Sequence, residues 1–183
     1  LQSGCAGFTY GAQGLWYPTQ DEKDQTVENW GAPVPWWQAV QRPGAEQMGW
    51  MRRCYESVPW WRTEPWPEAI ETDRKRPCTW RWTPVKNAWP RAPELEQEEA
   101  ANPAPLARGA RDGTAALVFF PCAFPPAAPV ALRLPGSATA PLRAEWFNPR
   151  SGGRQAAALP VRDGQEQRLP DRLDNQDWVL ILS

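Results

Sequence analysis

Histidine is absent from this 183-residue sequence. Without it the chain cannot build a Ser-His-Asp or Cys-His nucleophile, and it lacks the commonest metal ligand in proteins. Long apolar runs are also absent, since no stretch approaches the roughly 18 apolar residues of a membrane-spanning helix. The formal net charge is −1, which gives no basic surface for nucleic acid. We therefore expect neither a membrane span nor a nucleic-acid partner.

Cysteine is sparse and widely spaced. Cys5, Cys54, Cys78 and Cys122 form no Cys-x-x-Cys pair, which argues against a zinc site. Their even number allows three disulfide pairings, and free buried thiols are the alternative. No glycine-rich phosphate loop is present, so nothing supports nucleotide chemistry. We expect no cofactor and no bound metal.

Glycine and aromatic residues are concentrated near the start of the chain. Gly7–Trp16 is typical of a short buried strand that runs into a loop interrupted by glycine, and Phe8, Tyr10 and Trp16 supply rigid aromatic walls. Such a loop suits a binding edge, because glycine lets the backbone approach a ligand closely. The alternative is a packed aromatic strand with an ordinary exit turn.

The clearest helix follows at Pro43. Proline suits the first helical turn, and an apolar stripe then recurs at helical spacing until Pro59 ends the pattern. The stripe consists of Met48, Met51, Tyr55 and Val58. Such a stripe needs a partner surface elsewhere in the fold.

The pattern changes to a period of two from Pro105 onward. Leu106–Arg111 and Ala115–Phe120 flank Asp112-Gly113, which predicts a hairpin. Further strands are predicted over residues 130–134, 142–146, 155–161 and 178–182, and the strands 115–120 and 178–182 are apolar on both faces. The sequence therefore predicts a small antiparallel β-sandwich over 105–183.

Three motifs at the start of the chain resemble the end of the apiosidase-like (β/α)8 glycoside hydrolase barrel, a TIM barrel. Gly7-Phe8-Thr9-Tyr10-Gly11 followed by Trp16 resembles the eighth strand, Pro43–Met48 the last barrel helix, and Pro59–Trp61 its exit. The resemblance implies that residues 1–66 are the C-terminal remnant of a barrel, and that in a complete barrel the apolar stripe of the helix packs on barrel strands. A complete barrel needs about 200 residues or more.

The end of the chain resembles the β module that follows this barrel, named in that family the "putative collagen-binding domain of a collagenase". Ala144–Gly152 and Asp177–Leu182 carry this resemblance. The implied domains are the barrel remnant 1–66, a Pro/Trp-rich linker 67–104 and the module 105–183. The fold class expected is thus α+β, with the last βα unit of a barrel followed by an antiparallel β-sandwich.

Two positions depart from the family pattern. Phe8 and Gln13 stand where the family has histidines, so the contacts that imidazole makes there are not available. By resemblance, the residues left to bind a sugar substrate are Tyr10, Gln13 and Trp16. They lie at the C-terminal end of the barrel strand, where such enzymes build their sites.

The resemblance places the family's catalytic carboxylates upstream of Leu1, so no catalytic residue is expected in this chain. It implies a C-terminal part of a secreted, extracellular or periplasmic hydrolase of plant pectic glycans, whose partners are a carbohydrate substrate and the upstream part of the barrel. The alternative is a non-catalytic module that binds glycan or an extracellular protein.

Other segments leave alternatives open. The acidic loop Tyr17–Asn29 is either solvated or in contact with substrate. The tryptophans of Pro59–Pro103 either stack on sugar or pack the seam between barrel and module. Three aspartates at three-residue steps suggest a calcium loop but lack its central glycine, and a solvated turn is the alternative. These are Asp171, Asp174 and Asp177.

Overall fold

The computed structural model describes Leu15 and residues 34–72, 104–122, 124–135, 141–160, 162–163 and 165–183. The described chain begins with two helices, α1 (Trp36–Ala39) and α2 (Pro43–Glu56), and a 3-10 turn, η1 (Trp60–Arg62). Pro43 occupies the first turn of α2, which ends three residues before Pro59. The predicted helix is confirmed. The predicted barrel strand at Gly7–Trp16 lies outside the described residues apart from Leu15.

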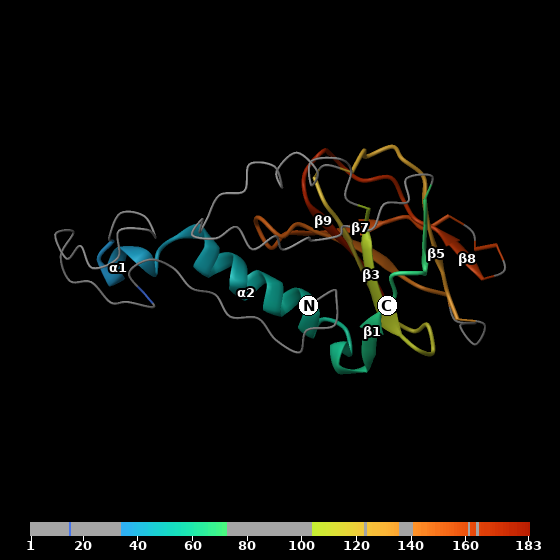
Figure 1. Cartoon of the computed structure of the whole chain (residues 1–183), viewed down its shortest axis with the longest axis horizontal. Coiled ribbons are helices and arrows are strands. Elements are labelled where there is room, and N and C mark those ends of the chain that lie inside the picture. Colours follow the sequence, from blue (N-terminus) through green and yellow to red (C-terminus); the bar gives the residue numbers. More distant parts are fainter. Residues whose placement is uncertain are drawn as a thin grey trace, which may run out of the picture.

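After the helices, the regular structure of the described chain is β-structure, in two antiparallel sheets (Figure 1). The six-stranded sheet has the order β1-β3-β4-β9-β6-β7, and the three-stranded sheet has the order β2-β5-β8. In chain order the strands are β1 (Thr63–Pro65), β2 (Ile70–Thr72), β3 (Leu106–Ala110), β4 (Ala116–Phe120), β5 (Val130–Arg133), β6 (Ala144–Phe147), β7 (Arg154–Ala157), β8 (Glu166–Arg168) and β9 (Trp178–Leu182). The antiparallel part of the predicted fold is thus confirmed.

The predicted hairpin forms between β3 and β4, with Leu106 opposite Phe119 and Gly109 opposite Ala116. Its connection is longer than the Asp112-Gly113 dipeptide suggested. The N–H of Gly113 donates to the carbonyl of Ala110 over 2.8 Å, and Gly113 has a φ of 71°. A four-residue loop built on a β-turn therefore joins the strands, with glycine at a position of positive φ.

Two short strands were not predicted from the sequence. Thr63–Pro65 and Ile70–Thr72 precede the predicted module, and they pair with β3 and β5. A third, Glu166–Arg168, was not predicted. Only its central residue, Gln167, is buried, so the strand lacks the apolar alternation by which strands are recognised.

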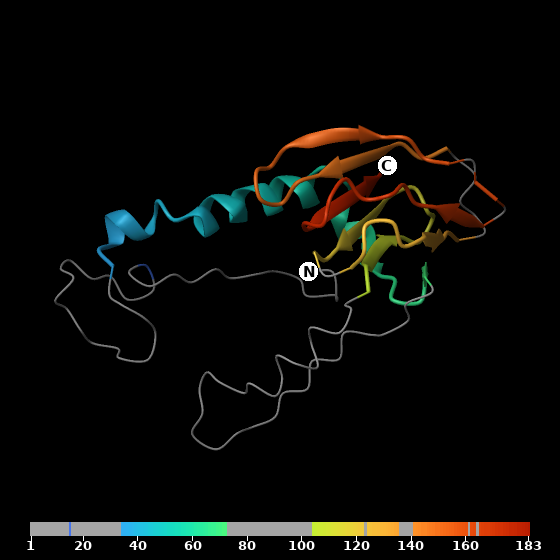
Figure 2. The same cartoon turned by 90° about the horizontal axis from the view of Figure 1, so that it is seen from above.

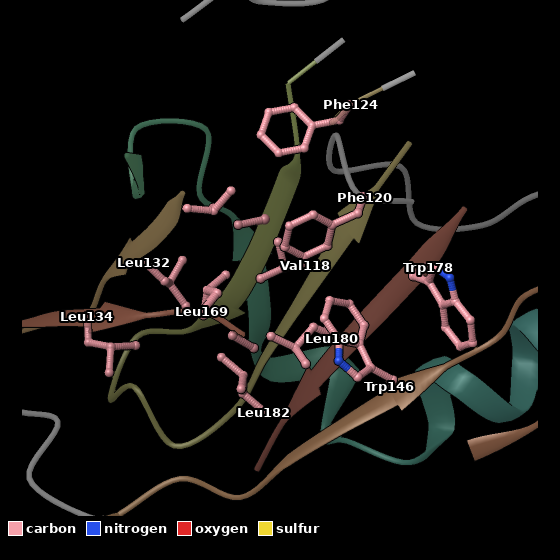
Figure 3. Close-up of a cluster of buried hydrophobic side chains, with 13 residues drawn as sticks. Val118, Phe120, Phe124, Leu132, Leu134, Trp146, Leu169, Trp178, Leu180 and Leu182 are labelled. Carbon is pink, nitrogen blue, oxygen red and sulfur yellow. The ribbon is translucent and has the colours of Figure 1, made fainter. Parts of the chain in front are cut away.

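The main hydrophobic core lies between the two sheets (Figure 3). Val118, Leu180 and Trp146 contribute from the large sheet and Leu132 from the small one, and all four are at most 2% exposed. The Trp146 ring meets Phe120 edge-on, with the ring centroids 5.3 Å apart. The expectation that Ala115–Phe120 and Trp178–Leu182 are buried strands is confirmed, because β4 and β9 are neighbours in the middle of the sheet.

The opposite face of the six-stranded sheet is covered by the C-terminal half of α2. Cys54 and Val58 are buried there at 2% and 3% exposure, against Leu117, Phe147 and Ile181. The apolar stripe of the helix was expected to pack on barrel strands. In the structure its C-terminal half instead packs on the β module, because alternate residues of β4 and β9 present apolar side chains to this face.

The N-terminal half of α2 leads away from the two sheets and carries α1 at its far end (Figures 1 and 2). Glu46, Gln47 and Gly49 are exposed along this half. From the middle of the helix onward the packing is close: a Cβ at Gly152, whose φ is +71°, would lie 2.8 Å from the Trp50 ring. The helix is therefore anchored at the module and extends from it.

Candidate functional site

The predicted sugar-binding residues Tyr10, Gln13 and Trp16 lie outside the described residues, as does the acidic loop Tyr17–Asn29. Their placement stays a prediction. Leu15, in the same stretch, is a half-buried turn residue. The described side chains belong to the helices and to the β module.

A buried polar cluster joins α2, η1 and the sheet. Arg108, on β3, is only 6% exposed. Its Nε donates to Thr63 Oγ1 over 2.7 Å and its Nη2 to the Thr63 carbonyl over 2.8 Å, while its guanidinium lies 5.8 Å from the centre of the Tyr55 ring. No pattern in the sequence indicates this cluster, because a single arginine in a strand looks solvent-facing. Its partners are structural, and it ties the end of α2 to the module.

Two titratable side chains beside this cluster are held neutral. Burial raises the pKa of the Cys54 thiol to about 12 and that of Tyr55 to about 12. A thiol with such a pKa is not a nucleophile near neutral pH. The described cysteines, Cys54 and Cys122, are both free, the first buried and the second exposed. Cys54 is therefore a packing residue.

The described carboxylates whose pKa is shifted are not tuned as general acids. Every resolved shift lowers the pKa: Glu64 accepts hydrogen bonds from Arg111, Asp112 from Thr114, and Asp174 from the Trp178 indole. A glycosidase acid needs the opposite, a raised pKa.

The aspartates that suggested a calcium loop have other partners. Asp174 Oδ1 accepts from the Gln176 backbone and from the indole of Trp178, and Asp177 Oδ1 accepts from the Cys122 backbone over 2.7 Å. Within the described ranges no three acidic or cysteine side chains converge as a metal site would require. This loop is held by hydrogen bonds.

Exposed tryptophans lie at both ends of the helical segment. Trp36 and Trp37 are 49% and 43% exposed, and their rings meet edge-on at 6.0 Å. Beyond the other end of α2, Trp60 and Trp61 form a similar pair at 6.2 Å, with Trp61 70% exposed. Exposed aromatic surface of this kind is typical of binding faces.

Two hollows open on the β module. One, of about 600 Å³, is here called the β1–β2 pocket and is lined by Pro65, Trp66, Pro67, Glu68, Ala69, Arg133, Leu134, Pro135 and Gln165. The other, of about 540 Å³, lies over β6, β7 and the end of β9, where Arg154 pairs with Glu145 at 2.8 Å. Both volumes fall in the range of about 300–1,000 Å³ found for small-molecule sites.

No described helix is long and apolar enough to cross a membrane. No curated protein matches the chain in sequence. One solved structure, titled "Glycoside hydrolase", superposes with a TM-score of 0.55 at 16% identity, over 87% of this chain and 29% of that one. Its likeness therefore concerns the fold, and the chain spans less than a third of its length.

A second solved structure, a glycoside hydrolase family 5 protein from Bacteroides vulgatus, superposes with a TM-score of 0.48 at 18% identity, over 84% of this chain and 28% of that one. Two family models match the sequence directly. Residues 1–62 match "Apiosidase-like, catalytic domain", and residues 97–183 match "Putative collagen-binding domain of a collagenase". The resemblance seen in the sequence motifs is confirmed: the chain joins a segment similar to an apiosidase-like catalytic domain to one similar to that collagen-binding domain.

Proposed function

We propose that the chain serves as the C-terminal part of a carbohydrate-active hydrolase of plant pectic glycans. In this proposal residues 1–66 supply the last strand and helix of a (β/α)8 barrel, and the β module follows as an accessory domain. The catalytic carboxylates come from barrel sequence outside these 183 residues. The sugar contacts within the chain are Tyr10, Gln13 and Trp16, and the protein acts outside the cytoplasm, in the extracellular space or the periplasm.

The packing of α2 carries this proposal. The helix lies in the segment that matches the apiosidase-like model, yet Cys54 and Val58 are buried in the sheet of the segment that matches the second model. Two segments that share one hydrophobic core form a fixed unit rather than two tethered domains. A barrel built on α2 would thus be held rigidly against the module.

The test joins the chain to the upstream barrel segment of an apiosidase-like enzyme and measures release of sugar from pectic glycans. The chain by itself is expected to show no turnover, and the joined protein is expected to hydrolyse. Gln13→Ala in the joined protein should lower kcat/KM by at least tenfold, about 1.4 kcal/mol, with an unchanged melting temperature. Gln47→Ala, an exposed change of the same type on α2, is the matched control. Turnover by the purified chain alone contradicts the proposal.

The second candidate function is a non-catalytic module that binds glycan. The observation that favours it is the β1–β2 pocket, in which an indole, a carboxylate and an amide surround one hollow. This candidate does not require a barrel. The second candidate function is compatible with the first, because an accessory module of a hydrolase and a free-standing binding module can bind the same glycan.

A further inference from the structure

The β1–β2 pocket is built from three segments that are far apart in sequence. The turn between β1 and β2 is closed by the Ala69 N–H, which donates to the Trp66 carbonyl over 3.1 Å. The Arg133 N–H donates to the Ala69 carbonyl and the Leu134 N–H to the Gln165 carbonyl, each over 2.8 Å. The turn, the end of β5 and the residue before β8 are thus fixed to one another. The pocket is pre-formed.

One wall of the pocket is aromatic and rigid. A Cβ at Gly109 would lie 2.4 Å from the Trp66 ring, so the indole rests directly on the backbone of β3. Pro65 and Pro67 flank this tryptophan and Pro135 faces the same hollow, and each proline fixes its own φ. A wall held this way costs little entropy when a ligand packs on it.

The charged and polar side chains of the pocket lining bear on which ligands it can accept. Arg133 is paired with Glu71, so that among the described residues of the lining the Glu68 carboxylate is the charge with no opposite charge paired to it. An anionic sugar such as a uronate would be repelled by it. A carboxylate accepts two hydrogen bonds and the Gln165 amide both donates and accepts. That set fits the neighbouring hydroxyls of a neutral sugar.

From these observations we propose that the β1–β2 pocket binds a short neutral saccharide, in preference to an acidic one. The choice of carbohydrate as the ligand class rests on the proposed function; the pocket, its aromatic wall and its charge do not. The ligand would lie between Trp66 and the pair of polar side chains, Glu68 and Gln165. In a pectic substrate this selects the neutral side chains over the galacturonate backbone.

The experiment titrates the full chain by calorimetry with two neutral probes, a galactotetraose and an arabinotetraose, and with tetragalacturonate. Saturable binding of at least one neutral probe is expected, with at least tenfold weaker binding of the galacturonate. Gln165→Ala and Glu68→Gln should each raise Kd for the neutral probe by tenfold or more. Both side chains are exposed, so that folding should survive the changes.

Matched controls are Gln47→Ala and Glu46→Gln, two exposed changes of the same types on α2, which should leave Kd unchanged. The pocket proposal is overturned if no neutral probe binds, if the galacturonate binds more tightly, or if the pocket and control variants bind alike. Failure of the hydrolase proposal would look different. In that case the joined protein would be inactive, while the full chain would still bind the neutral probe and the pocket variants would still lose that binding. An active joined enzyme whose pocket binds no neutral probe would instead overturn the pocket proposal alone.

Discussion

The two faces of the six-stranded sheet are covered by different kinds of layer. One face packs on the three-stranded sheet through large apolar side chains such as Trp146 and Leu180. The other packs on α2 and includes a thiol, Cys54, with the buried guanidinium of Arg108 close to Tyr55. The first layer is made within the module, and the second attaches the helix of the preceding family segment. Alternate side chains of the same strands therefore point to opposite faces: one set forms the core of the module, and the other set holds α2 against the sheet.

The inter-sheet layer should be the costlier one to damage. Trp146→Ala removes a ring that is 2% exposed and packed against Phe120 and Trp178. We expect a loss of about 3–5 kcal/mol in the free energy of unfolding, measured by urea titration of the full chain. A loss below about 1 kcal/mol would mean that the module is not held by this core.

The helix layer should cost less for a comparable truncation. Val58→Ala removes two buried methyl groups between the end of α2 and the sheet, and about 2 kcal/mol is expected from lost transfer energy and the small cavity. Amide exchange would locate the effect. It should accelerate along α2 more than along β4 and β9. Equal acceleration in the central strands would show that helix and module unfold as one unit.

Alkaline pH should weaken the helix layer selectively. The pKa of Cys54 is about 12 in the folded chain against 9.0 for a free thiol. The unfolded chain loses this proton first, so stability is complete below pH 9 and falls as pH rises toward 12. A loss of about 1 kcal/mol is expected at pH 10 relative to pH 8.

The Cys54→Ala variant tests the origin of this pH dependence. Its urea midpoint should fall less between pH 8 and pH 10 than that of the parent chain. Tyr55, whose pKa is also raised to about 12, should add its own loss above pH 10 in both proteins. The same slope in both proteins below pH 10 would contradict the assignment to the thiol.

The sequence predicted those elements whose own residues determine them. β4 and β9 are apolar on both faces, and α2 has a proline at its start and a helical apolar stripe. β1 and β8 could not be found this way. Thr-Glu-Pro and Glu-Gln-Arg carry no strand pattern, and they become strands because β3 and β5 offer open edges to pair with.

The two candidate sites also differ in how far the sequence could predict them. Tyr10, Gln13 and Trp16 could be named only through a family resemblance, and they lie outside the described residues. The β1–β2 pocket could not be predicted at all. Trp66, Arg133 and Gln165 are distant in sequence, and only the pairing of β2 with β5 and of β5 with β8 brings their segments together.

The smallest predicted effect concerns the half of α2 that lies beyond the module. Gly49 is exposed in the helix interior, and an added Cβ there would meet nothing within 4 Å. Gly49→Ala should therefore stabilise the chain by about 0.5–1 kcal/mol, because alanine loses less backbone entropy in a helix. If a barrel packs on this half of the helix, as the proposed function implies, the added methyl group has to fit against it. The gain should then shrink or reverse in the joined protein, so measuring the same substitution with and without the barrel tests whether this half of α2 is a contact surface. A destabilising effect in the chain alone would show that this half of the helix is already covered.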